Sequence, residues 1–281
     1  MPDLPPEATW IGKDPGKMTV ATAKGPVLVH LFDFSQLNSV RTLPYLIEWD
    51  RKYRPLGLTV IGVQVPRFPF GADPAAVEAG LARLGVEFPV VIDADRILQS
   101  SYGFEGWPSL FLWGRGGILR WFHFGEGEYE GTEQAIQEAL QAAGKAAPKP
   151  GQEVPEGLPE GLPELPEPTA PLRDTDAPGA EVLPPGEELI PGDGRPFTRA
   201  DGGGFDIDYR DAGYGSAHVT AAGRGALMVS IDGEPLEPVR VDGPGLYALA
   251  DREVAGAHRI SIELEGEPEI WSVSFAPTVK R

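Results

Sequence analysis

An apolar run followed directly by a helical pattern, within residues 26–46, constrains the fold of this chain more than any other stretch. The run VLVHLF is nearly continuous, as expected for a strand that is covered on both faces. Beyond it, Leu43 and Leu46 recur at helical spacing, so we expect a helix that begins near Ser39. A strand buried on both faces needs helices on either side of its sheet, which predicts an α/β fold.

The rest of the first half continues this alternation. Residues 58–65 predict a second buried strand, and Asp73 followed by Pro74 is typical of a helix start. Residues 110–124 predict a hairpin through the turn GRGG, and Thr132 is placed to cap a last helix. Strands interleaved with helices and followed by a hairpin indicate an α/β domain.

Residues 40–46, VRTLPYL, resemble the TlpA/DipZ-like group of thioredoxin-fold proteins. In that group a Cys-x-x-Cys pair opens the helix just before this segment. Counting back places Gln36 and Ser39 at the two cysteine positions. The resemblance covers roughly residues 8–143 and implies a thioredoxin-like fold.

Two further segments carry the same resemblance. Trp107-Pro108 matches the position of a cis proline that precedes a strand and faces the helix of the redox pair. Residues 123–127, HFGEG, match a segment of the DipZ-like group. The resemblance therefore implies a cis peptide bond before Pro108.

The sequence contains no cysteine. Thioredoxin chemistry requires a reactive thiolate and a second thiol that resolves the mixed disulfide. Thiol–disulfide exchange by this chain alone is therefore excluded, and we expect no catalytic residue and no cofactor. An enzyme that acts through another group stays an alternative, although no acid–base pair supports it.

The stretch from residue 145 to 191 differs in composition, with the sequence EGLPEGLPELPEP and further prolines and acids. Such a segment is too poor in apolar residues to form a core, and proline favours an extended chain. We expect an acidic, proline-rich linker over residues 145–191. The linker would separate a domain of residues 1–144 from one of residues 192–281.

Short segments of alternating apolar and polar residues follow from Phe205, many separated by Asp-Gly turns. This pattern predicts a β-sandwich or jelly roll. The segments VSIDG (229–233), LYAL (246–249) and WSVSF (271–275) resemble the carbohydrate-binding-module-like domain that follows thioredoxin in DipZ-type proteins. Tyr209 and Tyr214 flank an expected turn and are candidates for stacking on a sugar.

A candidate peptide-binding groove combines Ser35 and Asn38 with Trp107 and Pro108. The resemblance implies that extended polypeptide docks here by strand-like pairing. The alternative is that Ser39 or Asn38 simply caps the helix. We expect a redox-inactive binding or scaffold protein with a protein or peptide partner, and carbohydrate binding by the second domain is the alternative.

Metal binding has little support in the sequence. Its four histidines are widely spaced, without zinc-ligand motifs, and His30 is expected to be a core residue with satisfied polar atoms. Glu126, Glu128 and Glu130 lack EF-hand spacing, so we interpret them as a solvated acidic loop rather than a calcium site.

The formal charge of −18 disfavours nucleic acid and anionic membrane surfaces as partners. No window contains the roughly 20 apolar residues of a membrane span, so no membrane insertion is expected. The start MPDLPPEATW lacks the features of a signal peptide. We expect a cytoplasmic protein, or an extracytoplasmic one if the sequence is a piece of a longer chain.

Overall fold

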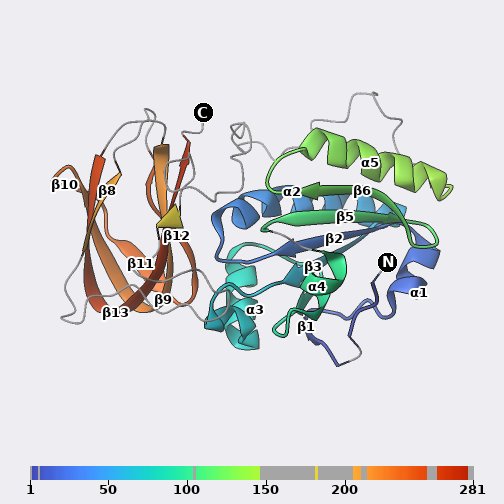
Figure 1. Ribbon diagram of the computed structural model, residues 1–281, viewed down its shortest axis with the longest axis horizontal. Helices are drawn as coiled ribbons and strands as arrows, with labels where there is room; N and C mark the ends of the chain where they lie inside the picture. Colours follow the sequence, from blue (N-terminus) through green and yellow to red (C-terminus); the bar gives the residue numbers. More distant parts are fainter. Residues whose placement is uncertain are drawn as a thin grey trace. The chain divides into compact units, whose positions relative to one another are not determined.

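The computed structural model describes residues 2–5, 7–103, 106–145, 181–182, 205–209, 214–251 and 258–277. The chain divides into two compact units. The first combines helices with a mixed sheet, and the second consists of strands in the described residues (Figure 1).

The first unit is built on a six-stranded sheet of order β1-β4-β3-β2-β5-β6. Strands β2, β3 and β4 are parallel, whereas β5 runs antiparallel to both β2 and β6. The strands are β1 (Thr9–Ile11), β2 (Val27–Phe32), β3 (Thr59–Gln64), β4 (Val90–Ile92), β5 (Ser109–Gly114) and β6 (Ile118–Phe124). The buried strands and the hairpin that the sequence predicts are confirmed.

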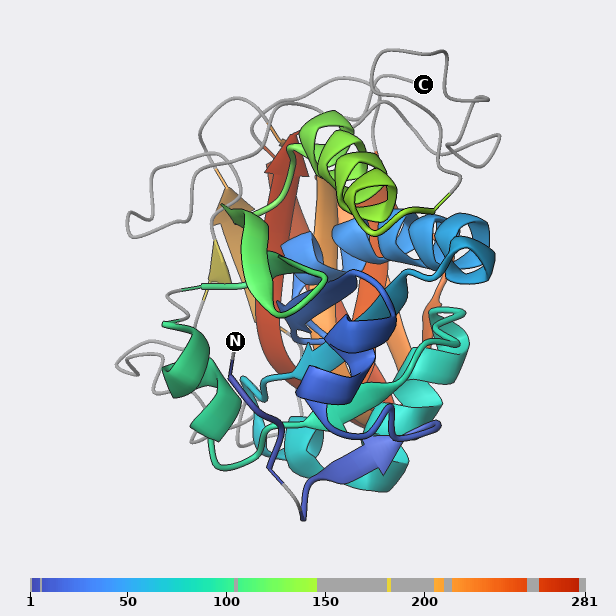
Figure 2. The ribbon, with the colours of Figure 1, turned by 90° about the vertical axis from the view of Figure 1, so that its right-hand side faces the viewer.

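Helices cover both faces of this sheet. On one face, Met18 and Tyr102 pack on a core that includes Val29 and Leu31. On the other face α2 and α5 lie side by side (Figures 1 and 2). The helices are α1 (Met18–Lys24), α2 (Leu37–Tyr53), α3 (Pro74–Arg83), α4 (Ile97–Tyr102) and α5 (Tyr129–Ala142), with 3-10 turns η1 (Arg54–Leu56) and η2 (Pro69–Ala72). Helix α1 was not predicted from the sequence.

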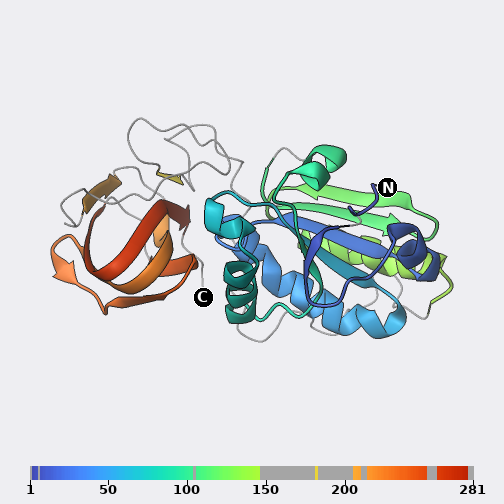
Figure 3. The ribbon, with the colours of Figure 1, turned by 90° about the horizontal axis from the view of Figure 1, so that it is seen from below.

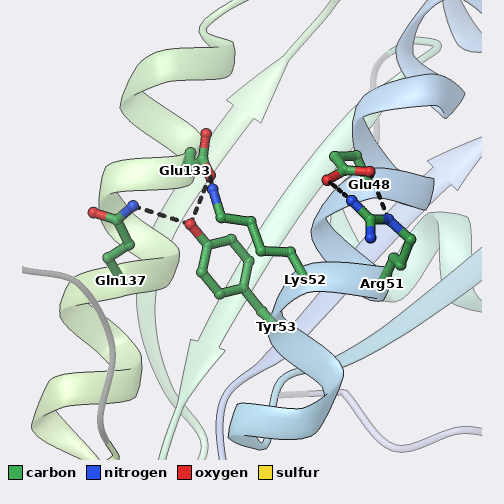
Figure 4. A network of polar contacts seen from close by, with 6 residues as sticks. All are labelled: Glu48, Arg51, Lys52, Tyr53, Glu133 and Gln137. Carbon is green, nitrogen blue, oxygen red and sulfur yellow. Dashed lines mark hydrogen bonds and ion pairs between the residues drawn. The ribbon is translucent and has the colours of Figure 1, made fainter. Parts of the chain in front are cut away.

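Polar contacts join α2 to α5 near the carboxyl end of α2 (Figure 4). The Tyr53 hydroxyl donates to Glu133 Oε1 (2.6 Å), and Lys52 Nζ lies 2.7 Å from the same oxygen. Gln137 Nε2 donates to the Tyr53 hydroxyl (3.0 Å). Burial, followed by the bond to Glu133, raises the pKa of Tyr53. These contacts fix α2, whose other end carries Gln36 and Ser39, the residues that the resemblance places at the cysteine positions.

Two helix starts differ from the sequence prediction. Helix α2 begins at Leu37 rather than near Ser39, because Gln36 is its N-cap, and the helix continues through Pro44. Helix α5 begins at Tyr129, so Thr132 lies inside it and does not cap it. The Thr132 hydroxyl instead accepts a hydrogen bond from Trp121 Nε1 (3.1 Å).

The second unit is organised by two long antiparallel strands, β9 (Tyr214–Ile231) and β13 (His258–Pro277), which Figure 3 shows as strongly curved ribbons. One half of β9 pairs with β12 and the other with β11 and β10, while β13 pairs with β8 and β7. The shorter strands are β7 (Glu181–Val182), β8 (Phe205–Tyr209), β10 (Glu234–Pro235), β11 (Val239–Asp242) and β12 (Gly245–Asp251). Apolar residues from both halves share one core, as in the predicted β-sandwich.

The sequence pattern suggested separate short strands where β9 and β13 are continuous. Glycines explain the difference, because they permit close approach of the two strands. A Cβ at Gly225 would lie 2.1 Å from the carbonyl oxygen of Glu265, and Gly266 has a φ of +86°. The sequence breaks therefore mark bends within strands rather than strand ends.

The predicted boundaries of the linker remain a prediction, because residues 146–180 and 183–191 lie outside the described residues. Strand β7 lies within the predicted linker. Its two residues pair with Val273 and Ser274 of β13, so at least this part of the segment belongs to the sheet.

Candidate functional site

The topology of the sheet brings three segments to one edge. Strand β5 begins at Ser109, which pairs with Leu31 near the end of the antiparallel strand β2. Residues that follow β2 therefore lie close to residues that precede β5. Strand β6 ends at Phe124 opposite Ser109, so the segment after β6 reaches the same edge. The Gly125 N–H donates to the carbonyl oxygen of Pro108 (2.8 Å).

The loop between β2 and α2 is held by hydrogen bonds within the chain. The backbone N–H and the hydroxyl of Ser35 both donate to Asp33 Oδ1 (2.8 and 2.5 Å). Gln64 Nε2 donates to the other oxygen of Asp33 (3.2 Å), and Gln64 Oε1 accepts from the Phe34 N–H (3.0 Å). Since Ser35 is fully buried, its hydroxyl supports the loop and does not face a ligand.

Gln36 and Ser39, which the resemblance places at the two cysteine positions, have structural roles. Gln36 Oε1 accepts a hydrogen bond from the Ser39 N–H (2.7 Å), which caps α2. Ser39 Oγ accepts from the Asp33 N–H (3.3 Å), and Ser39 is fully buried. The side chain of Gln36 therefore caps α2. The alternative interpretation, in which Ser39 or Asn38 caps this helix, is wrong. Gln36 and Asn38 remain partly exposed.

Trp107-Pro108 has a cis peptide bond, as the resemblance implied. The Trp107 indole donates to the carbonyl oxygen of Val65 (3.0 Å) and packs on the core beside α1 and α4. This side chain therefore supports the fold. At the preceding residue, Gly106, an added Cβ would meet no atom of the described residues within 4 Å, so the main chain has open space beside it with respect to them.

The segment after β6 contains a buried acid that the sequence interpretation placed in a solvated loop. Glu126 is only 3% exposed, and its Oε1 lies 2.9 Å from Arg41 Nε on α2. Burial raises the pKa of Glu126 to about 7, against the opposing effect of Arg41. The interpretation of Glu126 as solvated is wrong, because the turn after β6 directs this side chain against α2.

An aromatic stack accompanies this ion pair. The rings of Tyr45 and Tyr129 are parallel, with centroids 3.6 Å apart. Burial and then the Glu126 carboxylate raise the pKa of the Tyr129 hydroxyl. Sequence reasoning did not single out Arg41, Tyr45 or Tyr129, although Arg41 and Tyr45 lie in VRTLPYL and Glu126 in HFGEG. Those two segments indicate the fold, but their local sequence does not specify that they contact each other.

His30 lies in the middle of β2 and is fully buried, as expected of a core residue. Its ring stacks on Phe32 at a centroid distance of 4.9 Å. Neither ring nitrogen has a hydrogen-bond partner among the described residues, so the expectation of satisfied polar atoms is wrong. Burial lowers the pKa of His30 to about 3.

The described residues contain neither a cluster suited to a metal ion nor a helix suited to cross a membrane. No group of three or more His, Cys, Asp and Glu side chains there is arranged to hold a metal ion. None of the described helices combines the length and the hydropathy needed to cross a membrane.

Comparisons with known proteins agree with this geometry over the first unit. Protein DipZ of Mycobacterium tuberculosis (strain CDC 1551 / Oshkosh) is 32% identical over 134 residues, which are 47% of this chain and 19% of DipZ. The first unit has a thioredoxin-like fold. Its thiol-disulfide oxidoreductase homologues include YkuV of Bacillus subtilis (strain 168), 26% identical over 44% of this chain and 83% of YkuV. No protein-family model matches the chain.

Solved structures of this kind include a thiol-disulfide isomerase from Corynebacterium glutamicum. It is 21% identical, with a TM-score of 0.40, over 50% of this chain and 96% of that chain. The chain spans about a fifth of the length of the DipZ proteins that it matches.

The candidate sugar-stacking residues lie in the second unit. Tyr209 ends β8 and Tyr214 begins β9, and their backbones pair with His258 and Pro277 at opposite ends of β13. Their side chains lie outside the described residues, so sugar stacking stays a prediction. Tyr247 is part of the β-sandwich, with its hydroxyl donating to the carbonyl oxygen of Gly243 (2.6 Å).

Proposed function

We propose that the thioredoxin-like domain binds an extended polypeptide without thiol–disulfide exchange. The polypeptide would lie at the edge formed by Gln36 and Asn38, Gly106 to Pro108, and Gly125. The proposal rests on the roles of Gln36 and Ser39, the residues at the two expected cysteine positions. Gln36 caps α2 and the Ser39 hydroxyl supports the loop, so both positions serve the shape of this edge and neither serves redox chemistry.

Contacts around the edge support a preformed site. The Asp33 and Gln64 network fixes the loop before α2, and the ion pair of Arg41 and Glu126 fixes the segment after β6. Rigid positioning lowers the entropy cost of binding. Open space at Gly106 would allow the main chain of a partner to approach closely.

The proposal can be tested by nuclear magnetic resonance with reduced, carboxymethylated α-lactalbumin, an unfolded polypeptide without free thiols. We expect the backbone signals of Gln36, Asn38, Gly106 and Gly125 to shift on addition of this probe. Folded α-lactalbumin is the control and should leave them unchanged. Shifts confined to the second unit, or no shifts, would refute a site at this edge.

A further inference from the structure

The edge strand β6 presents an apolar row that the thioredoxin-like core does not use. Leu119, Phe122 and Phe124 are 42%, 53% and 46% exposed. They pair with Trp113, Phe111 and Ser109 of β5 and so share one face of the sheet with them. The Phe122 and Phe124 rings pack against each other, with centroids 5.5 Å apart, and both contact Phe111.

Strand β6 forms one lateral edge of the sheet, and this lateral edge is less protected than the opposite one, which is formed by β1. Strand β1 has three residues, whereas β6 has seven and contains neither proline nor glycine. Among the described residues β6 pairs with β5 alone, so one side of its main chain is open to a further strand. A pairing irregularity at Arg120 leaves 121–124 as the regular stretch. Open edges of this kind accept extended peptides.

The charge of the hairpin indicates the chemistry of the partner. Residues 109–125 contain no acid, although the chain has a net charge of −18. Arg115 and Arg120 are exposed, and neither forms an ion pair with another described residue. Salt screens distant charges, so a local basic strip can attract an acidic segment despite the net charge.

We propose that β6 adds a strand from an acidic polypeptide whose apolar side chains cover Phe122 and Phe124. This inference rests on the proposed function, because the carboxyl end of β6 adjoins the proposed polypeptide site at Pro108. Phe124 lies opposite Ser109, and Gly125 bonds to Pro108. The partner's acidic residues would pair with Arg115 and Arg120.

Three labelled peptides test this inference by fluorescence anisotropy with the full chain. One alternates Phe with Glu, the second replaces Glu with Lys, and the third replaces Phe with Ser. We expect the Phe/Glu peptide to bind tightest. The double substitution Phe122→Ser/Phe124→Ser should weaken it by about tenfold or more, since the apolar contact of the peptide with both aromatic side chains is lost. Arg115→Glu/Arg120→Glu should weaken the Phe/Glu peptide and strengthen the Phe/Lys peptide.

Val20→Ser is the matched control, because Val20 is 49% exposed on α1. Equal binding of the Phe/Glu peptide by the wild type, the control and the Phe122→Ser/Phe124→Ser variant would overturn the inference, as would no binding. A Gly106→Trp variant separates it from the proposed function. Binding reduced by Gly106→Trp alone would retain the proposed function and reject the β6 strip. Binding reduced by the β6 variants alone would retain the strip and reject the site at Gly106.

Discussion

Arg41 Nε on α2 lies 2.9 Å from Glu126 Oε1, and the residue before Glu126 is hydrogen-bonded to Pro108. This relationship joins α2 to the loop that precedes β5. Because both partners are largely buried, the ion pair fixes the edge but carries a desolvation cost.

Protonation of Glu126 should appear in the pH dependence of stability. Its pKa is raised to about 7 from its ordinary value of 4.5, so the folded state binds the proton more tightly than the unfolded state. The stabilisation is full below about pH 4.5 and is lost as the pH rises through about 7. The shift corresponds to roughly 3 kcal/mol. Urea unfolding from pH 4.5 to 8 should show this decline, and Glu126→Gln should remove it.

Glu128→Gln is the control for this prediction, because Glu128 is an exposed neighbour. Its unfolding free energy should follow that of the wild type at every pH. Identical pH profiles for Glu126→Gln and the wild type would contradict the assignment.

His30 should change stability in the opposite direction. Its pKa is lowered to about 3, so its stabilising effect is full above about pH 6.5 and is lost as the pH falls. We expect His30→Leu to raise the unfolding free energy by about 1 kcal/mol at pH 7, because two buried nitrogens without partners are removed. The gain should increase at pH 5. A variant less stable than the wild type at both pH values would show that the imidazole is satisfied.

Gly80 should be intolerant of a side chain despite its place in α3. In an exposed helix, Gly→Ala adds about 1 kcal/mol of stability. Here a Cβ would lie 2.5 Å from the Phe34 ring, in the loop before α2. We expect Gly80→Ala to lower the unfolding free energy by about 1–3 kcal/mol, as measured by urea denaturation. A stabilised variant would show that Phe34 moves freely.

Restoring the two thiols tests how much of the redox scaffold is retained. We expect Gln36→Cys/Ser39→Cys to form a disulfide in oxidised glutathione, because both positions lie at the start of α2 as in the TlpA/DipZ-like pattern. The helix N-terminus should lower the pKa of the thiol at position 36 below about 8.5. Thiol titration measures both effects, with each single variant as a control. Two thiols that stay reduced would show that the site has diverged in geometry.

The sequence was most informative where periodicity and resemblance agreed. The apolar run VLVHLF predicted β2, and VRTLPYL indicated the helix α2. The assignment of Gln36 and Ser39 to the cysteine positions stays a prediction from the resemblance. The contact between Arg41 and Glu126 was not predicted, because it joins residues distant in sequence through a turn whose direction no local pattern specifies. The sequence pattern predicts strand ends where β9 and β13 bend, since glycine marks both features. The sequence predicted the burial of His30. Whether its ring nitrogens find hydrogen-bond partners depends on the neighbouring strands, which the sequence of β2 does not specify.

The affinity of the full chain for carboxymethylated α-lactalbumin, compared between wild type and Gly106→Trp, tests the central claim most directly. The indole would enter the open space at Gly106 without displacing a described atom at its Cβ. Ala79→Trp, at an exposed position on α3, is the control. The predicted result is a loss of affinity of about tenfold or more in Gly106→Trp, with no loss in Ala79→Trp. Equal affinity in all three proteins would contradict polypeptide binding at this edge.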